Sequence, residues 1–333
     1  MPKAVLEGLK HYPVKISVIC AMLDSGGSAG RLRRDYKIVS PGDIRRALIA
    51  LADTSPVMSD LFNYRFEVGE LKGHNFANLL ITALELSSNS YEKTMDEVKR
   101  MLRIRHEVLP ATLDRSNLCA VLENGKTIRG ETNIDIPKHD PKLRIKRVFL
   151  QPKAQAYEKA VGAALEADAI IIGPGDLYSS LAQILLVDGM SEAIVKSKAK
   201  KIYLSNVMTK RGETDGYDVE TFTNEIEKYL GGEVDYVLYN SRQPAPSRVA
   251  RHKAADRTAA EVVSLRESSR SAASGKFVGL DLLSDSGSVV HDPEKVAAAI
   301  IGLTNSKKTR RGKEAQNKKT QSLKRKITDK TVG

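Results

Sequence analysis

The chain has 333 residues, of which 41% are hydrophobic, and this length allows one large buried core or two smaller ones. No apolar run approaches the roughly 20 residues of a membrane span, and the first residues lack the pattern of a secretory signal, so we expect a cytoplasmic protein. The two cysteines, Cys20 and Cys119, lie in separate apolar runs, which excludes a disulfide framework and a cysteine-based metal site.

Most of the net charge of +12 is concentrated at the end of the chain. Residues 306–333 contain 11 lysines and arginines and 2 acidic residues, so this tail carries +9 and the remaining residues carry +3. The tail has no apolar periodicity and no aromatic residue, and we therefore expect a disordered, solubilising extension. Weak contact of the tail with nucleic acid or another polyanion stays open as an alternative.

Short β-branched runs alternate with helical patterns in the rest of the chain. The expected strands are Val14–Met22, Asn117–Leu122, Arg144–Leu150, Asp168–Ile172, Lys201–Ser205 and Asp235–Tyr239. The expected helices are Ile44–Leu51, Asn75–Leu86, Tyr91–Leu102, Ala154–Glu166, Leu177–Val187, Val219–Leu230 and Glu294–Leu303. Residues 123–126 (ENGK) favour a local hairpin instead. This alternation predicts an α/β fold with a mainly parallel sheet and helices on both faces.

Glycine and asparagine gather where four of these strands end. Two strands run into glycine-rich loops, 24–30 (DSGGSAG) and 173–180 (GPGDLYSS), and two end at Asn206 and Asn240. The carboxyl ends of parallel strands share one edge of a sheet, where ligands bind, and glycines let backbone N–H groups approach an anion. The loops therefore predict a phosphate site. The alternative is that the glycines serve tight turns only, with Asp43 and Asp176 as helix N-caps.

Several common catalytic motifs are absent from the sequence. It contains no GxSxG elbow, no GxxxxGK[ST] loop and no HExxH, and His74 and His291 have no partner at metal-ligand spacing. No nucleophile with an adjacent base can be named.

Six segments together resemble the signature of the gluconeogenesis-factor (YvcK-like) family, which is related to CofD, the 2-phospho-L-lactate transferase of deazaflavin cofactor synthesis. They are DSGGSAGRLRRDY…SPGDIRRALIALAD, YRF…LKGHNFANLLITAL, VLPAT, IRGE, IIGPGDLYSSL and NVMTKRGETDGY. The resemblance extends from about Val5 to Leu303. It implies one Rossmann-like domain over residues 1–305, a cytoplasmic protein and a pocket for a sugar nucleotide such as UDP-N-acetylglucosamine. The implied role is in carbon flux toward cell-wall precursors and in cell shape.

The resemblance also implies a set of ligand-binding residues. The set is Asp24, Gly26, Gly27, Ser28, Gly30, Arg31, Asp43, His74, Asn78, Gly173, Gly175, Tyr178, Ser180, Asn206, Thr209 and Glu213. Arg31 and Arg33 would neutralise a diphosphate, and Asp24 and Asp43 are the candidates for holding a metal or a sugar hydroxyl and for any catalytic role. Asp176 stands where the family pattern has serine, and Lys210 stands where it has glutamine.

The beginning of the chain departs from the family pattern. Family members open with an apolar strand and a GGGTG loop that leads into a helix, and residues 4–12 (AVLEGLKHY) resemble the latter part of that helix. The resemblance implies that a central strand and its glycine loop are missing here. We therefore expect weak nucleotide binding that an upstream extension would restore.

Three functional classes stay open. The favoured one is a regulatory protein that binds a sugar nucleotide without turnover. The second is a CofD-like transferase that uses magnesium, a nucleotide diphosphate donor and a deazaflavin acceptor. The chain has no tryptophan and only 5% aromatic residues, so a pocket for the flat ring of the acceptor is less expected. The third is a polyanion-binding protein that works through its tail. Homo-oligomer formation is compatible with all three.

Overall fold

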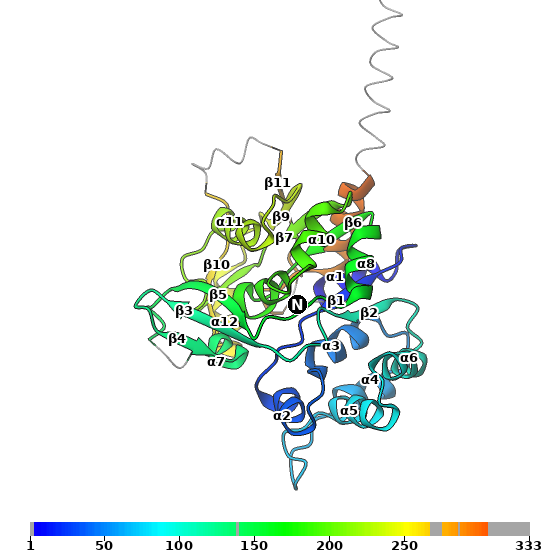
Figure 1. Cartoon of the computed structure of the whole chain (residues 1–333). Helices are drawn as coiled ribbons and strands as arrows, with labels where there is room; N and C mark the ends of the chain where they lie inside the picture. The colour runs from blue at the N-terminus through cyan, green and yellow to red at the C-terminus, as the bar shows by residue number, and fades with distance from the viewer. Residues whose placement is uncertain (1–2, 138–139, 267–274, 286, 306–333) are drawn as a thin grey trace, which may run out of the picture.

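The structure is a computed structural model that describes residues 3–137, 140–266, 275–285 and 287–305 (Figure 1). The basic tail that the sequence predicts to be disordered lies outside the described residues. Within those residues, no helix combines the length and the apolar composition that a membrane span requires.

Parallel strands form the centre of the molecule in two groups (Figure 1). A four-stranded sheet has the order β11-β9-β7-β6, from β11 (Phe277–Leu280), β9 (Tyr236–Asn240), β7 (Lys200–Leu204) and β6 (Ala169–Ile172). A separate parallel pair joins β1 (Ser17–Cys20) to β2 (Glu107–Pro110). The two groups face each other through β6 and β1.

Two hydrophobic clusters cover the two faces of these strands. Side chains alternate along a strand, and Ile170 packs in one cluster while Ile171 packs in the other. β1 divides in the same way, with Ile19 in the first cluster and Val18 and Cys20 in the second. β1 and the four-stranded sheet therefore share the same two faces, and their side chains belong to the same two cores.

Amphipathic helices supply the other half of each core. The first face is covered by α8 (Glu158–Glu166), η1 (Leu177–Ala182), α9 (Gln183–Leu185), α10 (Met190–Lys196) and α11 (Val219–Leu230). In α11, Phe222, Ile226 and Leu230 recur every four residues, which places them on one buried stripe. The second face is covered by α1 (Lys3–Leu9), α3 (Pro41–Leu51) and a helix over 293–305.

Smaller elements surround this centre. Between β1 and β2 the chain forms α2 (Gly27–Tyr36), α3, α4 (Pro56–Asn63), α5 (Phe76–Ser88) and α6 (Tyr91–Met101). An antiparallel sheet has the order β4-β3-β5, from β4 (Thr127–Arg129), β3 (Asn117–Leu122) and β5 (Ile145–Gln151). The remaining elements are α7 (Glu131–Asp135), β8 (Met208–Lys210), β10 (Ala259–Val262) and α12 (Pro246–Ala255).

The structure confirms the α/β class, all six expected strands and the hairpin, in which the Leu122 N–H donates to the Lys126 carbonyl at 2.9 Å. Three details of the prediction are wrong. The strands at Asn117–Leu122 and Arg144–Leu150 belong to the antiparallel sheet, because the hairpin pairs them locally. Helix α2 begins at Gly27, inside the glycine-rich loop expected over 24–30. Helix α3 begins at Pro41, so its N-cap residue is Ser40 and not Asp43, which lies in the first turn of the helix.

Candidate functional site

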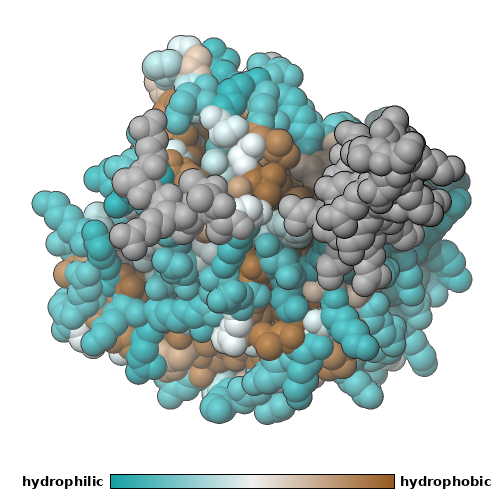
Figure 2. Space-filling model, turned by 90° about the horizontal axis from the view of Figure 1, so that it is seen from above, coloured by the Kyte–Doolittle hydropathy of each residue, from teal (hydrophilic) through white to brown (hydrophobic). Residues whose placement is uncertain are grey.

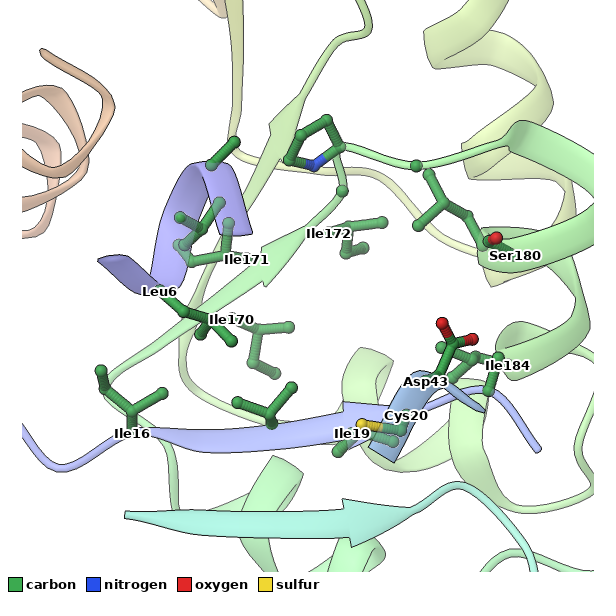
Figure 3. Close-up of a pocket in the computed structure, with 18 of the residues that line it drawn as sticks. Leu6, Ile16, Ile19, Cys20, Asp43, Ile170, Ile171, Ile172, Ser180 and Ile184 are labelled. Atoms are coloured by element: carbon green, nitrogen blue, oxygen red, sulfur yellow. The ribbon is translucent and has the colours of Figure 1, made fainter. Parts of the chain in front are cut away.

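A cavity of about 1450 Å³ opens between β1 and β6 (Figure 3). One end lies where the two strands finish, and Asp43 and Ser180 face each other there (Figure 3). We call this polar end the mouth. It is lined by Asp24, Gly26, Gly27, Asp43, Arg46, Glu131, Thr132, Asp135, Gly173, Gly175, Asp176, Ser180 and Asn206. Both glycine-rich loops of the sequence therefore reach one cavity at one edge of the sheet.

The loop after β1 requires glycine because neighbouring backbone and side chains approach it closely. A Cβ atom at Gly30 would lie 2.2 Å from the carbonyl carbon of Ser25, and one at Gly26 would lie 2.4 Å from the Oγ1 of Thr132. Gly27 has a φ of +55° and begins α2. The glycines thus hold the first turn of α2 against the loop, and the N-terminal N–H groups of the helix lie beside the mouth.

The loop after β6 is fixed by the end of the next strand. Gly173 has a φ of +90°, and a Cβ atom there would lie 2.7 Å from the carbonyl oxygen of Leu204. The Asn206 amide makes two hydrogen bonds to Gly175, accepting from its N–H at 3.3 Å and donating to its carbonyl at 2.9 Å. Asn206 therefore holds this loop at the mouth.

Acidic side chains and one arginine concentrate charge at the mouth. Burial, with Asp43 nearby, raises the pKa of Asp24 to about 7, although Arg46 opposes the shift. The Arg46 Nε donates to the Asp43 carboxylate at 2.9 Å. Burial and the neighbouring Asp135 also raise the pKa of Glu131. The mouth thus contains a protonatable carboxyl group beside an ion pair.

A second charged cluster adjoins the mouth. The Lys210 ammonium contacts Asp135, lies 3.2 Å from an Asp176 carboxylate oxygen and lies 3.7 Å from one of Glu213. The other oxygen of Glu213 accepts hydrogen bonds from the backbone N–H groups of Tyr178 (2.7 Å) and Ser179 (3.3 Å) at the start of η1. Burial and Asp176 raise the pKa of Glu213 to about 7, against the effect of Lys210.

Asp176 and Lys210 are the two departures from the family pattern noted above, and they are in contact. The carboxylate that would repel a phosphate is therefore paired with an ammonium group on β8. Ligand atoms of Asp135, Asp176 and Glu213 all lie within 4.8 Å of one another, an arrangement that suits a metal ion, but Lys210 supplies the positive charge there.

Eight residues of the expected ligand set lie outside the cavity wall. They are Ser28, Gly30, Arg31, His74, Asn78, Tyr178, Thr209 and Glu213. Three of them join α2 to the start of α5, since the Ser28 hydroxyl lies 3.2 Å from His74 Nδ1 and accepts from the Asn78 amide at 3.3 Å. Arg31 donates to the Lys72 carbonyl at 3.1 Å on the exposed side of α2. Arg33 bonds the Ser116 carbonyl, so neither arginine faces the mouth.

Tyr178 and Thr209, two further residues of this outer set, are buried inside the protein. The Tyr178 hydroxyl lies 2.9 Å from that of Tyr217 and donates to Glu225 at 3.1 Å, inside the protein. Thr209 accepts from the Glu261 N–H at 2.9 Å and joins β8 to β10. Neither side chain borders the cavity.

Sequence reasoning missed four residues of the mouth. Arg46 follows Asp43 by three positions on α3, and this spacing is a helical signal that could have identified the pair. Glu131, Thr132 and Asp135 lie on α7, which follows the antiparallel hairpin. Glu131 ends the IRGE segment of the family resemblance, a signal that could have identified it. Thr132 and Asp135 lie outside the quoted segments, and only the folding of the hairpin brings them to the parallel sheet.

Magnesium is the ion expected for a transferase, and three carboxylates of the mouth are candidate ligands. Asp24, Asp43 and Glu131 offer carboxylate oxygens, the ligands that magnesium prefers. The pKa of Asp24 is raised first by burial and then by the nearby Asp43, and a bound cation would lower it. Among the described residues, the carboxylates whose ligand atoms lie within 4.8 Å of one another are those of Asp135, Asp176 and Glu213, so Asp24, Asp43 and Glu131 would have to move closer together to hold an ion.

The sequence matches the family described as 2-phospho-L-lactate transferase CofD over residues 3–278. The chain belongs to the CofD family. Curated relatives include the gluconeogenesis factor of Bacillus subtilis, 37% identical over 90% of this chain and 93% of that protein. A putative gluconeogenesis factor of Clostridium acetobutylicum is 42% identical over 71% of this chain, and the match spans 53% of that protein.

A solved structure supports the fold of this CofD-family chain. The crystal structure of a member of the UPF0052 family from Bacillus halodurans superposes with a TM-score of 0.83 at 36% sequence identity, over 90% of this chain and 96% of that one. The resemblance to the gluconeogenesis-factor group is therefore confirmed by sequence and by structure.

Proposed function

We propose that this chain is a cytoplasmic regulatory protein that binds a nucleotide diphosphate sugar, such as UDP-N-acetylglucosamine, in the mouth without turnover. Through this ligand it would regulate carbon flux toward cell-wall precursors and cell shape. The supporting observation is that the glycine-rich loops after β1 and β6 line the same cavity. The relatives named gluconeogenesis factor favour the regulatory role.

The chemistry of the mouth suits a diphosphate. The start of α2 presents backbone N–H groups, and Arg46 adds a guanidinium group. Below about pH 7 Asp24 is neutral and can donate a hydrogen bond to a phosphate or sugar oxygen. Asn206 fixes the second loop, so that it needs little rearrangement on binding.

A CofD-like transferase is the second candidate, and the carboxylates of Asp24 and Asp43 favour it. With magnesium bound there, this chain would hold and orient a nucleotide diphosphate donor for attack by an acceptor alcohol. In such a mechanism the residues that bind and orient the donor and the acceptor contribute to the rate, and no nucleophile of the protein is required.

Titration calorimetry of the full chain with UDP-N-acetylglucosamine, UDP and GDP, with and without magnesium, tests the proposal. We expect Asn206→Ala to weaken binding of the preferred nucleotide at least about tenfold, because it releases the loop after β6. Asn63→Ala, an exposed change on α4, is the matched control. Equal affinities for Asn206→Ala and the parent would contradict the proposal. Release of product from a nucleotide diphosphate donor would favour the transferase.

A further inference from the structure

Four charged side chains from separate parts of the chain meet beside the mouth, and we call them the Lys210 cluster. They are Asp135 on α7, Asp176 in the loop after β6, Lys210 on β8 and Glu213 in the turn that follows β8. Hydrophilic residues cover most of the face shown in Figure 2, where water can solvate them. In the cluster, by contrast, the side chain of Lys210 is 13% exposed and that of Glu213 has no exposed surface. Buried charges require partners, and here they are partners to one another.

A single ammonium group is shared among three carboxylates. The Lys210 Nζ contacts Asp135, lies 3.2 Å from Asp176 and lies 3.7 Å from Glu213. Three ionised carboxylates carry −3 and one ammonium carries +1, so a charge of −2 remains. A divalent cation in the same place would leave −1 and would balance the carboxylates more completely.

The three carboxylates are spaced as the ligands of one ion would be. Ligand oxygens of Asp135, Asp176 and Glu213 all lie within 4.8 Å of one another. Two oxygens bound to the same ion are at most twice the metal–oxygen distance apart, which is roughly 4–5 Å for hard divalent cations. These cations also prefer carboxylate oxygens. The cluster therefore has the ligand type and the spacing for such an ion at the place where the ammonium lies.

Contacts that do not involve Lys210 hold two of the carboxylates in place. One oxygen of Glu213 accepts from the backbone N–H groups of Tyr178 at 2.7 Å and Ser179 at 3.3 Å. The Ser179 hydroxyl donates to an oxygen of Asp135 at 3.3 Å. The start of η1 therefore orients both carboxylates, and we expect them to keep this orientation when the ammonium is removed.

The second oxygen of Glu213, Oε2, is an independent observation that points to a cation. It is buried, and among the described residues it has no hydrogen-bond partner. Its distance of 3.7 Å to the Lys210 Nζ exceeds that of a hydrogen bond. Buried polar atoms are nearly always partnered, so an oxygen that faces the centre of the cluster without a hydrogen bond is available as a ligand.

We propose that the Lys210 cluster is a site for a hard divalent cation in which Lys210 serves as a built-in cation. The ammonium lies where the ion would bind, and its removal would admit the ion. Asp176, which is 42% exposed and lines the cavity, gives access from the mouth. In a step that rests on the proposed function, the fixed ammonium neutralises charge on the β6 side of the mouth, so that nucleotide binding needs no divalent cation on this side.

Counting bound manganese ions tests the site, because Mn²⁺ loses its electron paramagnetic resonance signal on binding. The full-length proteins are the parent, Lys210→Ala, and Lys210→Ala combined with Glu213→Gln, in which glutamine keeps an oxygen for η1 and removes the charge. We expect Lys210→Ala to bind one Mn²⁺ per chain more than the parent, and Glu213→Gln to weaken this binding at least about tenfold. Equal numbers of bound ions in the parent and Lys210→Ala, or an added ion that Glu213→Gln leaves unaffected, would overturn the proposal.

Thermal unfolding gives a second readout, since Lys210→Ala removes the counter-charge of the cluster. We expect Mn²⁺ to raise the melting temperature of Lys210→Ala by at least about 2 °C more than that of the parent, because an ion that binds only the folded state stabilises it. If Lys210→Ala does not fold by itself, Mn²⁺ should restore its folding where sodium chloride of equal ionic strength does not. An equal effect of Mn²⁺ on both proteins, or folding that Mn²⁺ does not restore, would contradict the proposal.

Calorimetry with UDP-N-acetylglucosamine separates the cation site from the ligand. We expect added Mn²⁺ to strengthen nucleotide binding at least about tenfold more in Lys210→Ala than in the parent, because the ion replaces the lost ammonium beside the mouth. An added Mn²⁺ site without nucleotide binding to either protein would leave the cation site established and refute the proposed function. Nucleotide binding to the parent without an added Mn²⁺ site in Lys210→Ala would do the reverse.

Discussion

Asp24 holds its proton to a higher pH than an exposed aspartate does, because it is buried near Asp43. Its ordinary pKa is 3.8, and in the folded protein it is about 7. Between these values the unfolded chain has lost the proton and the folded chain keeps it. The free energy of unfolding therefore falls as the pH rises from about 4 to 7 and is constant above that range with respect to this group.

Asp24→Asn is expected to remove this pH dependence. At pH 8 the variant should be more stable than the parent by about 1–3 kcal/mol, whereas near pH 4 the difference should be small, since each unit of pKa shift corresponds to about 1.4 kcal/mol. Urea unfolding at the two pH values measures the effect. Asp60→Asn, at an exposed position of α4, is the control. An equal stability difference at both pH values would contradict the assigned cause.

The pair of Asp176 and Lys210 shows how two departures from the family pattern can compensate for each other. Lys210 is largely buried, and the side chain of Glu213 beside it has no exposed surface. Removal of the ammonium group would leave Asp135, Asp176 and Glu213 without a counter-charge. Asp176 is 42% exposed, so its own removal should cost less.

A double-mutant cycle tests this pair. We expect Lys210→Gln alone to destabilise the fold by about 3 kcal/mol, because it leaves buried carboxylates unpaired. Asp176→Ser alone should cost under about 1 kcal/mol, and the double variant should recover part of the Lys210→Gln loss, with a coupling of about 1–2 kcal/mol. Chemical denaturation of the four proteins gives the coupling. Strict additivity would show that the contact contributes no stability.

At the scale of elements, α1 is held against the helix over 293–305 by a close backbone contact. A Cβ atom at Gly8 would lie 2.1 Å from the carbonyl oxygen of Pro293 and 2.8 Å from the side chain of Ala297. The two helices cover the same face of the sheet beside the cavity between β1 and β6. Gly8 therefore sets how closely α1 approaches the other helix, and through α1 it shapes one wall of the cavity.

Gly8→Ala should separate these helices and destabilise the fold by about 1–3 kcal/mol, as overpacking generally does. Gly162 in α8 offers a matched comparison, since a Cβ atom there would meet nothing within 4 Å. Gly162→Ala should stabilise the fold by about 0.5–1 kcal/mol through helix propensity. Thermal unfolding of both variants provides the measurement. A stabilising Gly8→Ala would disprove the close contact.

At the scale of the whole molecule, most of the net charge lies in a different part of the chain from the folded elements. Residues 306–333 carry +9 of the +12 net charge, while the sheet, its helices and the mouth lie within residues 3–305. The tail should therefore affect contacts with polyanions and leave the cavity unaffected.

Deletion of residues 306–333 should leave the melting temperature unchanged within about 2 °C, because the sequence of the tail offers no apolar core. Binding to heparin or single-stranded RNA should weaken and lose most of its salt dependence. Differential scanning calorimetry and salt titrations of binding measure the two effects. Loss of nucleotide-sugar binding on deletion would favour the tail-based function over the mouth.

The sequence by itself determined the alternation of strands and helices, because local apolar periodicity reports directly on secondary structure. It also determined the two glycine loops, since positive φ angles and close backbone approach, as at Gly173, require glycine. Only the tertiary structure decided which side chains border the mouth. Arg31 and His74 bond to other parts of the protein and do not border the mouth, whereas Glu131 on α7 does. Long-range packing decides this, because it sets which face of a helix is turned toward the cavity and where the hairpin before α7 is placed. The cavity between β1 and β6 likewise follows from the packing of these strands on two shared cores, which no local pattern encodes.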